Sequence, residues 1–76
     1  MQGFYETNLL AQRIESVIEL SIRTSNCLMD ANIVTLGQLV EKSTGDLKRI
    51  KGFGEKSLQE LRTKLSRIGL SLNEEH

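Results

Sequence analysis

The chain has one cysteine, Cys27, and one histidine, His76, which is its last residue. A disulfide within the chain needs two cysteines, and a structural zinc site needs several cysteine or histidine ligands, so we expect no disulfide, no metal and no cofactor. With 76 residues the chain is too short for a Rossmann fold or a TIM barrel. At this size the burial of apolar surface barely exceeds the entropy lost on folding, so close packing of helices must stabilise the domain.

Helix is the expected state almost everywhere. The sequence has no proline, 4% aromatic residues and no long alternation of apolar and polar residues, which argues against a β fold. We therefore predict an all-α fold, a compact bundle of four to five short helices. The clearest helix ends at Gly69, where a left-handed C-cap is expected, and carries Glu60 and Lys64 as a pair. Its apolar stripe consists of Leu58, Leu61, Leu65 and Ile68.

Capping patterns mark the start of the preceding helices. Ser21 is the expected N-cap of a helix over residues 21–31, with Ile22, Leu28 and Ala31 facing inward. Thr35 with Gln38 three positions later forms a capping-box pattern. Either Ser43 or Thr44, followed by Asp46, opens a further short helix. Each of these helices is too short to be stable alone, so each must bury an apolar face.

The ends of the chain carry weaker patterns. Residues 1–12 are expected to be a flexible or partly helical segment, with Asn8 as a possible cap. Ile18, Leu20 and Ile22 alternate in the way that an extended crossing does. We expect residues 13–72 to form one domain and residues 73–76 to be a loosely held tail.

The most informative segment is residues 47–58, which predict a short helix, a Gly-Phe-Gly turn and a second helix. This order is typical of a helix-hairpin-helix element. Gly52 and Gly54 are expected to take backbone conformations that other residues avoid, while Phe53 plugs the turn onto the core. The open amides of the second helix would then favour an anion such as a DNA phosphate, with Lys56 and the Ser57 hydroxyl as partners. The alternative is a tight interhelical turn with no ligand.

The charges are distributed unevenly, although ten basic residues balance ten acidic ones. Residues 1–46 hold three basic and six acidic side chains, whereas residues 47–72 hold seven basic and two acidic ones. Such asymmetry favours a polyanion-facing end and a protein-facing or solvent-facing end. A solvated helix surface laced with salt bridges is the alternative.

Arg23 and Asn26 lie three positions apart and therefore on one helix face. An arginine is attracted to the negative potential of a narrow A/T-rich minor groove, and an asparagine can bond base edges or sugars. The alternative is a solvated face. Cys27 has no nearby histidine, so we expect it to pack at the helix surface, and no catalytic set can be assembled. No apolar run is long enough for a membrane span, and the lone thiol suits a cytoplasmic protein.

Four stretches together resemble the C-terminal domain of the bacterial RNA polymerase α subunit. They are residues 20–28 (LSIRTSNCL), 35–40 (TLGQLV), 47–57 (LKRIKGFGEKS) and 67–72 (RIGLSL). The resemblance covers residues 13–72 and implies four short helices after an irregular N-terminal segment. It also implies a non-catalytic part of a nucleotidyltransferase, DNA-directed RNA polymerase, either excised or as a stand-alone relative. The resemblance further implies binding to A/T-rich upstream promoter DNA at the bacterial nucleoid, and contacts with transcription activators and the σ subunit.

The resemblance also implies roles for individual residues. Arg23 would enter the minor groove with Asn26 beside it, and Glu60 would help to orient the basic groups. Gly54, Lys56 and Ser57 would hold phosphates. Two positions depart from the family pattern. Lys51 replaces a frequent proline and adds a charge at the turn, which makes it a further candidate for DNA binding, and Glu55 replaces a frequent lysine.

The same resemblance implies a contact with σ through an acidic cluster before the Arg23 helix. Only Glu19 of this cluster is acidic here, because Ser16 and Val17 occupy the neighbouring positions. We therefore expect weak docking on σ and an inward-facing Val17. Two other functions stay open. One is a stand-alone helical protein-interaction domain, and the other is a helix-hairpin-helix appendage of a DNA-repair enzyme, which leaves Arg23 and Asn26 unexplained.

Overall fold

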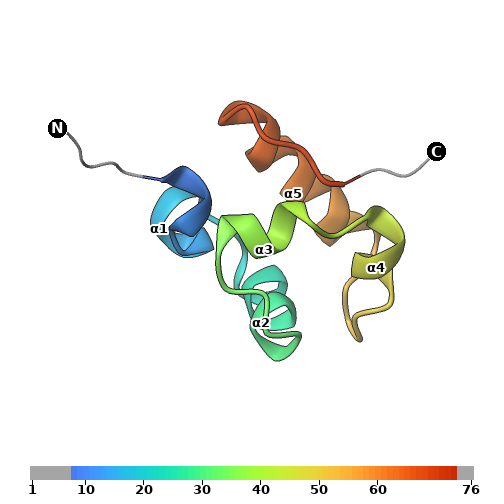
Figure 1. Ribbon diagram of the computed structural model, residues 1–76. Coiled ribbons are helices and arrows are strands. Elements are labelled where there is room, and N and C mark those ends of the chain that lie inside the picture. The colour runs from blue at the N-terminus through green and yellow to red at the C-terminus, as the bar shows by residue number, and fades with distance from the viewer. Residues whose placement is uncertain (1–7, 74–76) are drawn as a thin grey trace, which may run out of the picture.

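The structure is a computed structural model that describes residues 8–73, and helices account for most of that part of the protein (Figure 1). A 3-10 turn, η2, is followed by five α-helices, and the only β pairing within residues 8–73 is an isolated bridge between Arg13 and Thr35. The prediction of an all-α fold is therefore confirmed. The elements are η2 (Leu9–Ala11), α1 (Ile14–Val17), α2 (Ile22–Asp30), α3 (Leu36–Val40), α4 (Thr44–Lys48) and α5 (Glu55–Arg67).

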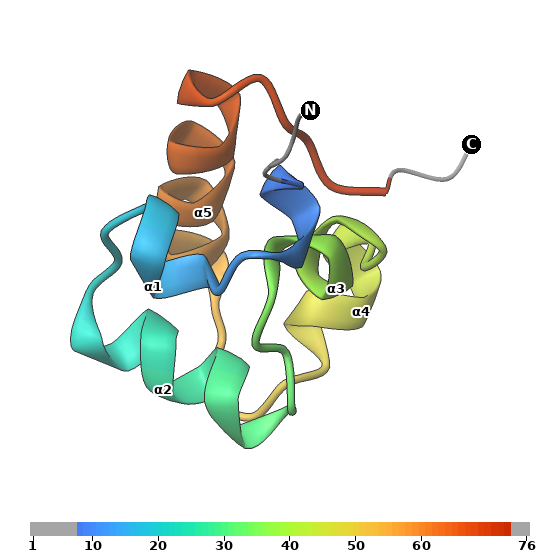
Figure 2. The ribbon, with the colours of Figure 1, turned by 60° about the vertical axis from the view of Figure 1, so that its left-hand side comes forward.

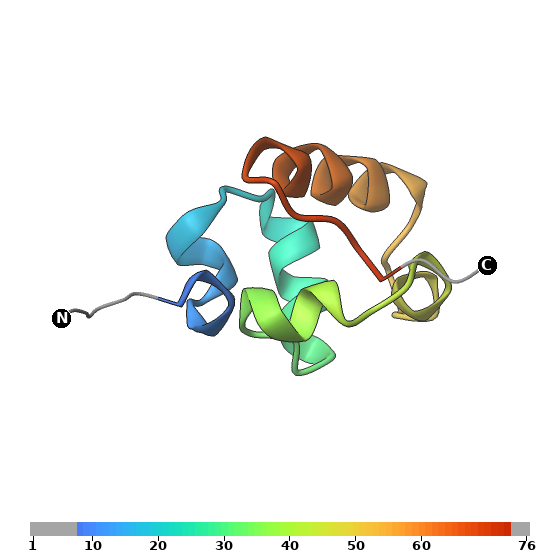
Figure 3. The same cartoon turned by 45° about the horizontal axis from the view of Figure 1, so that its top comes forward.

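A core of leucine side chains fills the space between the helices. In Figure 2, α5 stands beside α1, and α2 lies beneath the N-terminal end of α5. Figure 3 shows α4 next to that same end of α5 and η2 next to α3. The bundle therefore has its longest helix packed across several short ones. The most deeply buried apolar side chains are Leu28, Leu36, Leu39, Leu47, Leu61 and Leu65.

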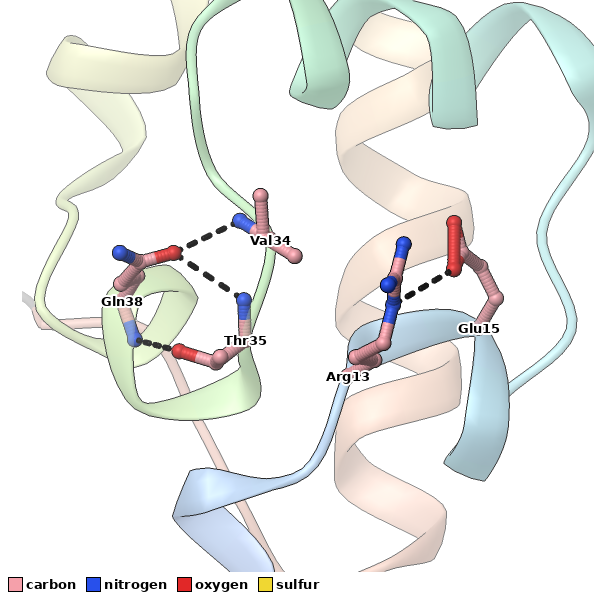
Figure 4. Close-up of polar contacts among 5 residues, drawn as sticks. All are labelled: Arg13, Glu15, Val34, Thr35 and Gln38. Atoms are coloured by element: carbon pink, nitrogen blue, oxygen red, sulfur yellow. Dashed lines mark hydrogen bonds and ion pairs between the residues drawn. The ribbon is translucent and has the colours of Figure 1, made fainter.

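The predicted caps form, which explains where the short helices begin. The Ser21 hydroxyl accepts from the Thr24 N–H at the start of α2. Both α3 and α4 begin with a complete capping box, formed by Thr35 with Gln38 and by Ser43 with Asp46. Figure 4 shows the Gln38 amide oxygen accepting from the backbone of Val34 and Thr35. These bonds satisfy helix-end donors that would otherwise lack a partner.

The C-terminal end of α5 also follows the prediction. Gly69 has a φ of 77°, in the left-handed region that favours glycine, and the Leu70 N–H returns to the Leu65 carbonyl at 2.9 Å. This is the bond of a Schellman motif, and it directs Leu70 back toward the core. The following Asn73, which we expected in a loose tail, donates its backbone N–H to the Lys42 carbonyl. Residues 74–76 of that predicted tail lie outside the described part.

The segment before α2 is tied to the rest of the molecule by its backbone. Asn8 caps η2 through a bond to the Leu10 N–H, as predicted, and the Ile14 N–H donates to the Val34 carbonyl. A Cβ added at Gly37 would lie 2.9 Å from the Leu10 carbonyl oxygen, so this glycine allows η2 to approach α3. Residues 9–11 are therefore partly helical as expected, and residues 1–7 of the same predicted segment lie outside the described part.

Two inward positions predicted for α2 are wrong. Ile22 is 80% exposed and Ala31 is also exposed, whereas Leu28 is buried as predicted. The buried stripe of α2 consists of Thr24, Cys27 and Leu28 instead. Hydropathy alone favours isoleucine over threonine for burial, but a threonine is readily buried when its hydroxyl has partners. Cys27, expected at the helix surface, belongs to the core because it lies on this same stripe.

Val17 turns inward as predicted, since it is half-buried and packs against the core. The apolar crossing after α1 is extended at Ile18, which is itself buried. None of the helices in residues 8–73 is long and apolar enough to cross a membrane. That part of the protein also has no group of three metal-ligating side chains.

Phe53 should be a large single contributor to the stability of this fold. It is 4% exposed and belongs to the core, so Phe53→Ala should lower the free energy of unfolding by about 3–5 kcal/mol. The matched control is Ile22→Ala at the exposed position on α2, which should change it by less than about 0.5 kcal/mol. Thermal unfolding followed by circular dichroism measures both. Similar melting temperatures for the two variants would contradict the contribution of the buried Phe53 side chain to the core.

Candidate nucleic-acid interface

An open groove runs between the start of α2, the turn after α4 and the start of α5. Its lining includes six of the seven residues predicted to bind DNA, and leaves out only Asn26. Five basic and two acidic side chains line it, so the local charge is positive although the whole chain is neutral. The charged lining residues are Arg23, Lys48, Arg49, Lys51, Lys56, Glu55 and Glu60.

The turn that forms one wall of the groove depends on Gly52. This residue has a φ of 86°, which side-chain-bearing residues rarely adopt. A Cβ added there would also lie 3.4 Å from the Cys27 Sγ, and that thiol lies 3.6 Å from the Lys51 carbonyl oxygen. Cys27 therefore packs under the turn and supports it. The Phe53 N–H closes the turn by donating to the Ile50 carbonyl at 3.0 Å.

Gly54 differs from the prediction in its conformation. Its φ is −117°, an extended value open to any residue, so the expectation that both glycines need special backbone angles is wrong here. No atom lies within 4 Å of a Cβ built at Gly54. Gly54 is the N-cap of α5 and supplies no capping side chain, so no side chain caps the first-turn amides of residues 55–57, and these residues line the groove.

The carboxylate of Glu60 joins α5 to α2 at the floor of the groove. Its two oxygens accept from the Ser21 N–H at 2.5 Å and from the Ser21 hydroxyl at 3.0 Å. The Thr24 hydroxyl lies 2.8 Å from Glu60 Oε1 and 3.1 Å from the Ser57 hydroxyl oxygen. Since a hydroxyl has one proton, Thr24 donates to the charged carboxylate and accepts from Ser57. Of the predicted pairing between Glu60 and Lys64, the attraction between their charges is present, and it lowers the pKa of Glu60.

This network engages the Ser57 hydroxyl, which was predicted to bind a phosphate. Ser57 is 6% exposed and its hydroxyl lies 3.1 Å from the Thr24 hydroxyl oxygen, so a phosphate would have to compete with this contact. The Ser57 backbone N–H lies in the first turn of α5, where amides have no acceptor within the helix. The residues that sequence analysis missed are Ser21 as a partner of Glu60 and Thr24 as the buried centre of the network. Ser21 and Glu60 are 39 positions apart, and no local pattern reports such a contact.

Arg23 and Asn26 occupy one exposed side of α2. Arg23 is the second residue of the helix and lines the groove, whereas Asn26 lies one turn further on, beyond the groove lining. Glu60 holds the Ser21 cap and thereby fixes the start of the helix that carries Arg23. The predicted influence of Glu60 on the basic groups stays a prediction, and these contacts would exert it through the backbone placement of α2.

Comparison with known proteins assigns this arrangement to a family. Residues 4–67 match the family described as the C-terminal domain of the bacterial RNA polymerase alpha chain. The protein belongs to this family. It is 49% identical over 53 residues to the DNA-directed RNA polymerase subunit alpha of Lawsonia intracellularis (strain PHE/MN1-00), covering 70% of this sequence and 15% of that protein.

A second relative in the same family gives a similar alignment. The DNA-directed RNA polymerase subunit alpha of Carboxydothermus hydrogenoformans (strain ATCC BAA-161 / DSM 6008 / Z-2901) is 43% identical over 58 residues. These residues are 76% of this sequence and 18% of that protein. The chain thus spans less than a fifth of the length of either alpha subunit, and the resemblance inferred from the sequence is confirmed at the level of the C-terminal domain.

The charge of Glu60 is essential to the network in this member of the alpha C-terminal domain family. Burial raises the pKa of Glu60, but hydrogen bonds from the Ser21 backbone, the Thr24 hydroxyl and the Ser21 hydroxyl lower it, so the net pKa falls below its ordinary value of 4.5. A lowered pKa means that the folded state favours the ionised form. The stability that Glu60 contributes is therefore present in full above pH 4.5 and is lost as the pH falls through the lower folded pKa.

Glu60→Gln should remove this pH-dependent stability. The amide nitrogen of Gln would face a donor of Ser21, so the variant should be less stable than wild type at pH 7 by about 1–3 kcal/mol. The difference should shrink on acidification below about pH 4.5, where wild type also loses its carboxylate. Urea unfolding between about pH 7 and pH 3 measures it. A difference that stays constant over this range would contradict the charged network.

Proposed function

We propose that this domain binds A/T-rich double-stranded DNA through the groove between α2 and α5, as a non-catalytic part of a bacterial RNA polymerase. Family membership supports the connection with the polymerase. The observation that carries the DNA-binding proposal is that Arg23 and the open first turn of α5 line one positively charged groove. A duplex offers a phosphate and a minor groove within a short distance of each other, which suits these two features together.

In this proposal Arg23 provides the sequence preference. Its guanidinium would enter the minor groove, where A/T-rich DNA is narrow and has an enhanced negative potential. Asn26 would contact bases or sugars one helical turn away. Minor-groove contacts distinguish mainly A·T from G·C pairs, so the preference would be for composition rather than for a long defined sequence.

The start of α5 would hold the phosphate backbone. Open amides at a helix N-terminus favour an anion, and the helix dipole adds to this attraction. Lys56 in the first turn and Lys51 in the preceding turn line the same groove and would add charge-assisted contacts. Gly54 would let a phosphate approach the amides, because it places no side chain over them.

The partners follow from the family. The remainder of the RNA polymerase would carry the domain, in the cytoplasm at the nucleoid, and transcription activators would dock on it. Glu19 and Ser16 are exposed at the end of α1, whereas Val17 is directed toward the core. A contact with σ would therefore rest chiefly on Glu19, and exposed ion pairs contribute little individually. We accordingly propose that the σ contact is weak.

Arg23→Ala should weaken binding to an A/T-rich duplex by about 1–3 kcal/mol, which is about 5- to 150-fold, because the groove loses its minor-groove arginine. The matched control is Arg13→Ala, which removes an exposed arginine at the start of α1 whose ion pair with Glu15 is 3.6 Å long. Fluorescence anisotropy with A/T-rich and G/C-rich duplexes measures both variants. The loss for Arg23→Ala should be larger on the A/T-rich duplex, and Arg13→Ala should match wild type.

The salt dependence of binding and its selectivity between duplexes distinguish the proposed function from the two alternatives. The logarithm of affinity should fall against the logarithm of salt concentration with a slope of about −3 to −4.5, for about three to five phosphate contacts. A slope near zero would favour a protein-interaction domain. Equal losses on both duplexes for Arg23→Ala would favour the less selective binding of a helix-hairpin-helix appendage.

Gly54→Asp should separate DNA binding from stability. The extended backbone and open space at Gly54 accept a side chain, and aspartate is a good N-cap, so the melting temperature should be unchanged or higher. DNA binding should fall by roughly tenfold or more, because the carboxylate occupies the phosphate position. Gly54→Asn is the matched control with the same shape and no charge, and it should lose much less affinity. Equal losses for the two variants would contradict a phosphate at this helix start.

A further inference from the structure

Glu55 is the exposed acidic side chain of the DNA-binding groove. The other acidic residue of the lining, Glu60, is committed to its hydrogen bonds with α2. Glu55 instead lies in the first turn of α5, at the position where the amides are open. Its carboxylate oxygen lies 3.0 Å from the Lys48 Nζ at the end of α4. A carboxylate in the first turn of α5 lies where the proposed function places a DNA phosphate.

Glu55 and Lys48 form an ion pair across the turn between α4 and α5. The hydrogen bond and the charge of Lys48 hold the pKa of Glu55 below its ordinary value, so the carboxylate is ionised at neutral pH. Both side chains are more than half exposed, and they join the two arms of the helix-hairpin-helix element. Lys48 lines the groove but is engaged by a charge of the protein itself.

We propose that Glu55 is an internal competitor of the DNA phosphate, which keeps Lys48 from the backbone and sets a low intrinsic affinity for this domain. The inference rests on the proposed DNA-binding function. Two effects act in the same direction. The carboxylate repels an approaching phosphate, and Lys48 must leave its ion pair before it can neutralise one.

Glu55→Gln tests this directly. Glutamine keeps the size of the side chain and removes the charge, and the position is exposed, so the variant should fold. Its affinity for the A/T-rich duplex should rise about three- to tenfold at about 0.1 M salt. The salt slope should become steeper by about 0.9, since the freed Lys48 adds one phosphate contact. A merely structural role for Glu55 would not steepen this slope.

The matched control is Glu15→Gln. Glu15 is also an exposed acid in the first turn of a helix with a basic partner, Arg13, but it lies outside the groove. This variant should bind DNA as wild type does. A gain in affinity as large as that of Glu55→Gln would mean that net charge alone is responsible, and it would overturn the inference.

The double variant Lys48→Ala with Glu55→Gln assigns the gain to Lys48. Its salt slope should return to the wild-type value, and a slope as steep as that of Glu55→Gln would overturn the role of Lys48. If wild type binds the A/T-rich duplex and Glu55→Gln binds it no better, the inference fails and the proposed function stands. If wild type, Arg23→Ala and Glu55→Gln all fail to bind DNA, the proposed function itself fails.

Discussion

The carboxylate of Glu60 is the interaction on which the arrangement of the groove depends. Glu60 belongs to α5, and its carboxylate accepts hydrogen bonds from both the backbone N–H and the hydroxyl of Ser21 at the start of α2. Because Ser21 is the N-cap of α2, this contact fixes where that helix begins and hence where Arg23 projects. The negative charge is also favourable at a helix N-terminus. One side chain of α5 thereby places the residue that we propose to read the minor groove.

Thr24 makes the same contact a part of the core. Its hydroxyl is fully buried and has both Glu60 and Ser57 as partners, so the usual cost of burying a polar group is offset. A domain of this size has little stability to spare, and a network that both holds two helices together and positions Arg23 serves two purposes with the same atoms. The buried thiol of Cys27 acts similarly beneath the turn at Gly52, since it supports the wall of the groove from inside.

The parts of the fold that could be predicted from the sequence are those decided within a few residues. The caps at Thr35 and Ser43 join atoms three positions apart, so their patterns are visible in the sequence and the structure contains them. The contact between Ser21 and Glu60 crosses 39 positions, and no periodicity reports it. The sequence places Ile22 rather than Thr24 on the inward side of α2, because the burial of Thr24 depends on hydrogen-bond partners from α5. The family resemblance, and not any local sequence pattern, predicted that residues of α2 and α5 belong to one site.

The charges that line the groove affect how strongly the domain would be attracted to DNA. Five basic side chains line it, but Glu55 neutralises Lys48 and the whole chain has a formal net charge of zero. In the proposed DNA complex, long-range attraction would therefore be weak, and binding would depend on short-range contacts in the groove. When a weak module is attached to a larger DNA-bound assembly, its effective concentration at a nearby site reaches the millimolar range for short flexible linkers. If the proposed function holds, a domain carried by the polymerase would bind DNA productively with a low intrinsic affinity, and that low affinity would keep it from holding the polymerase on unrelated DNA.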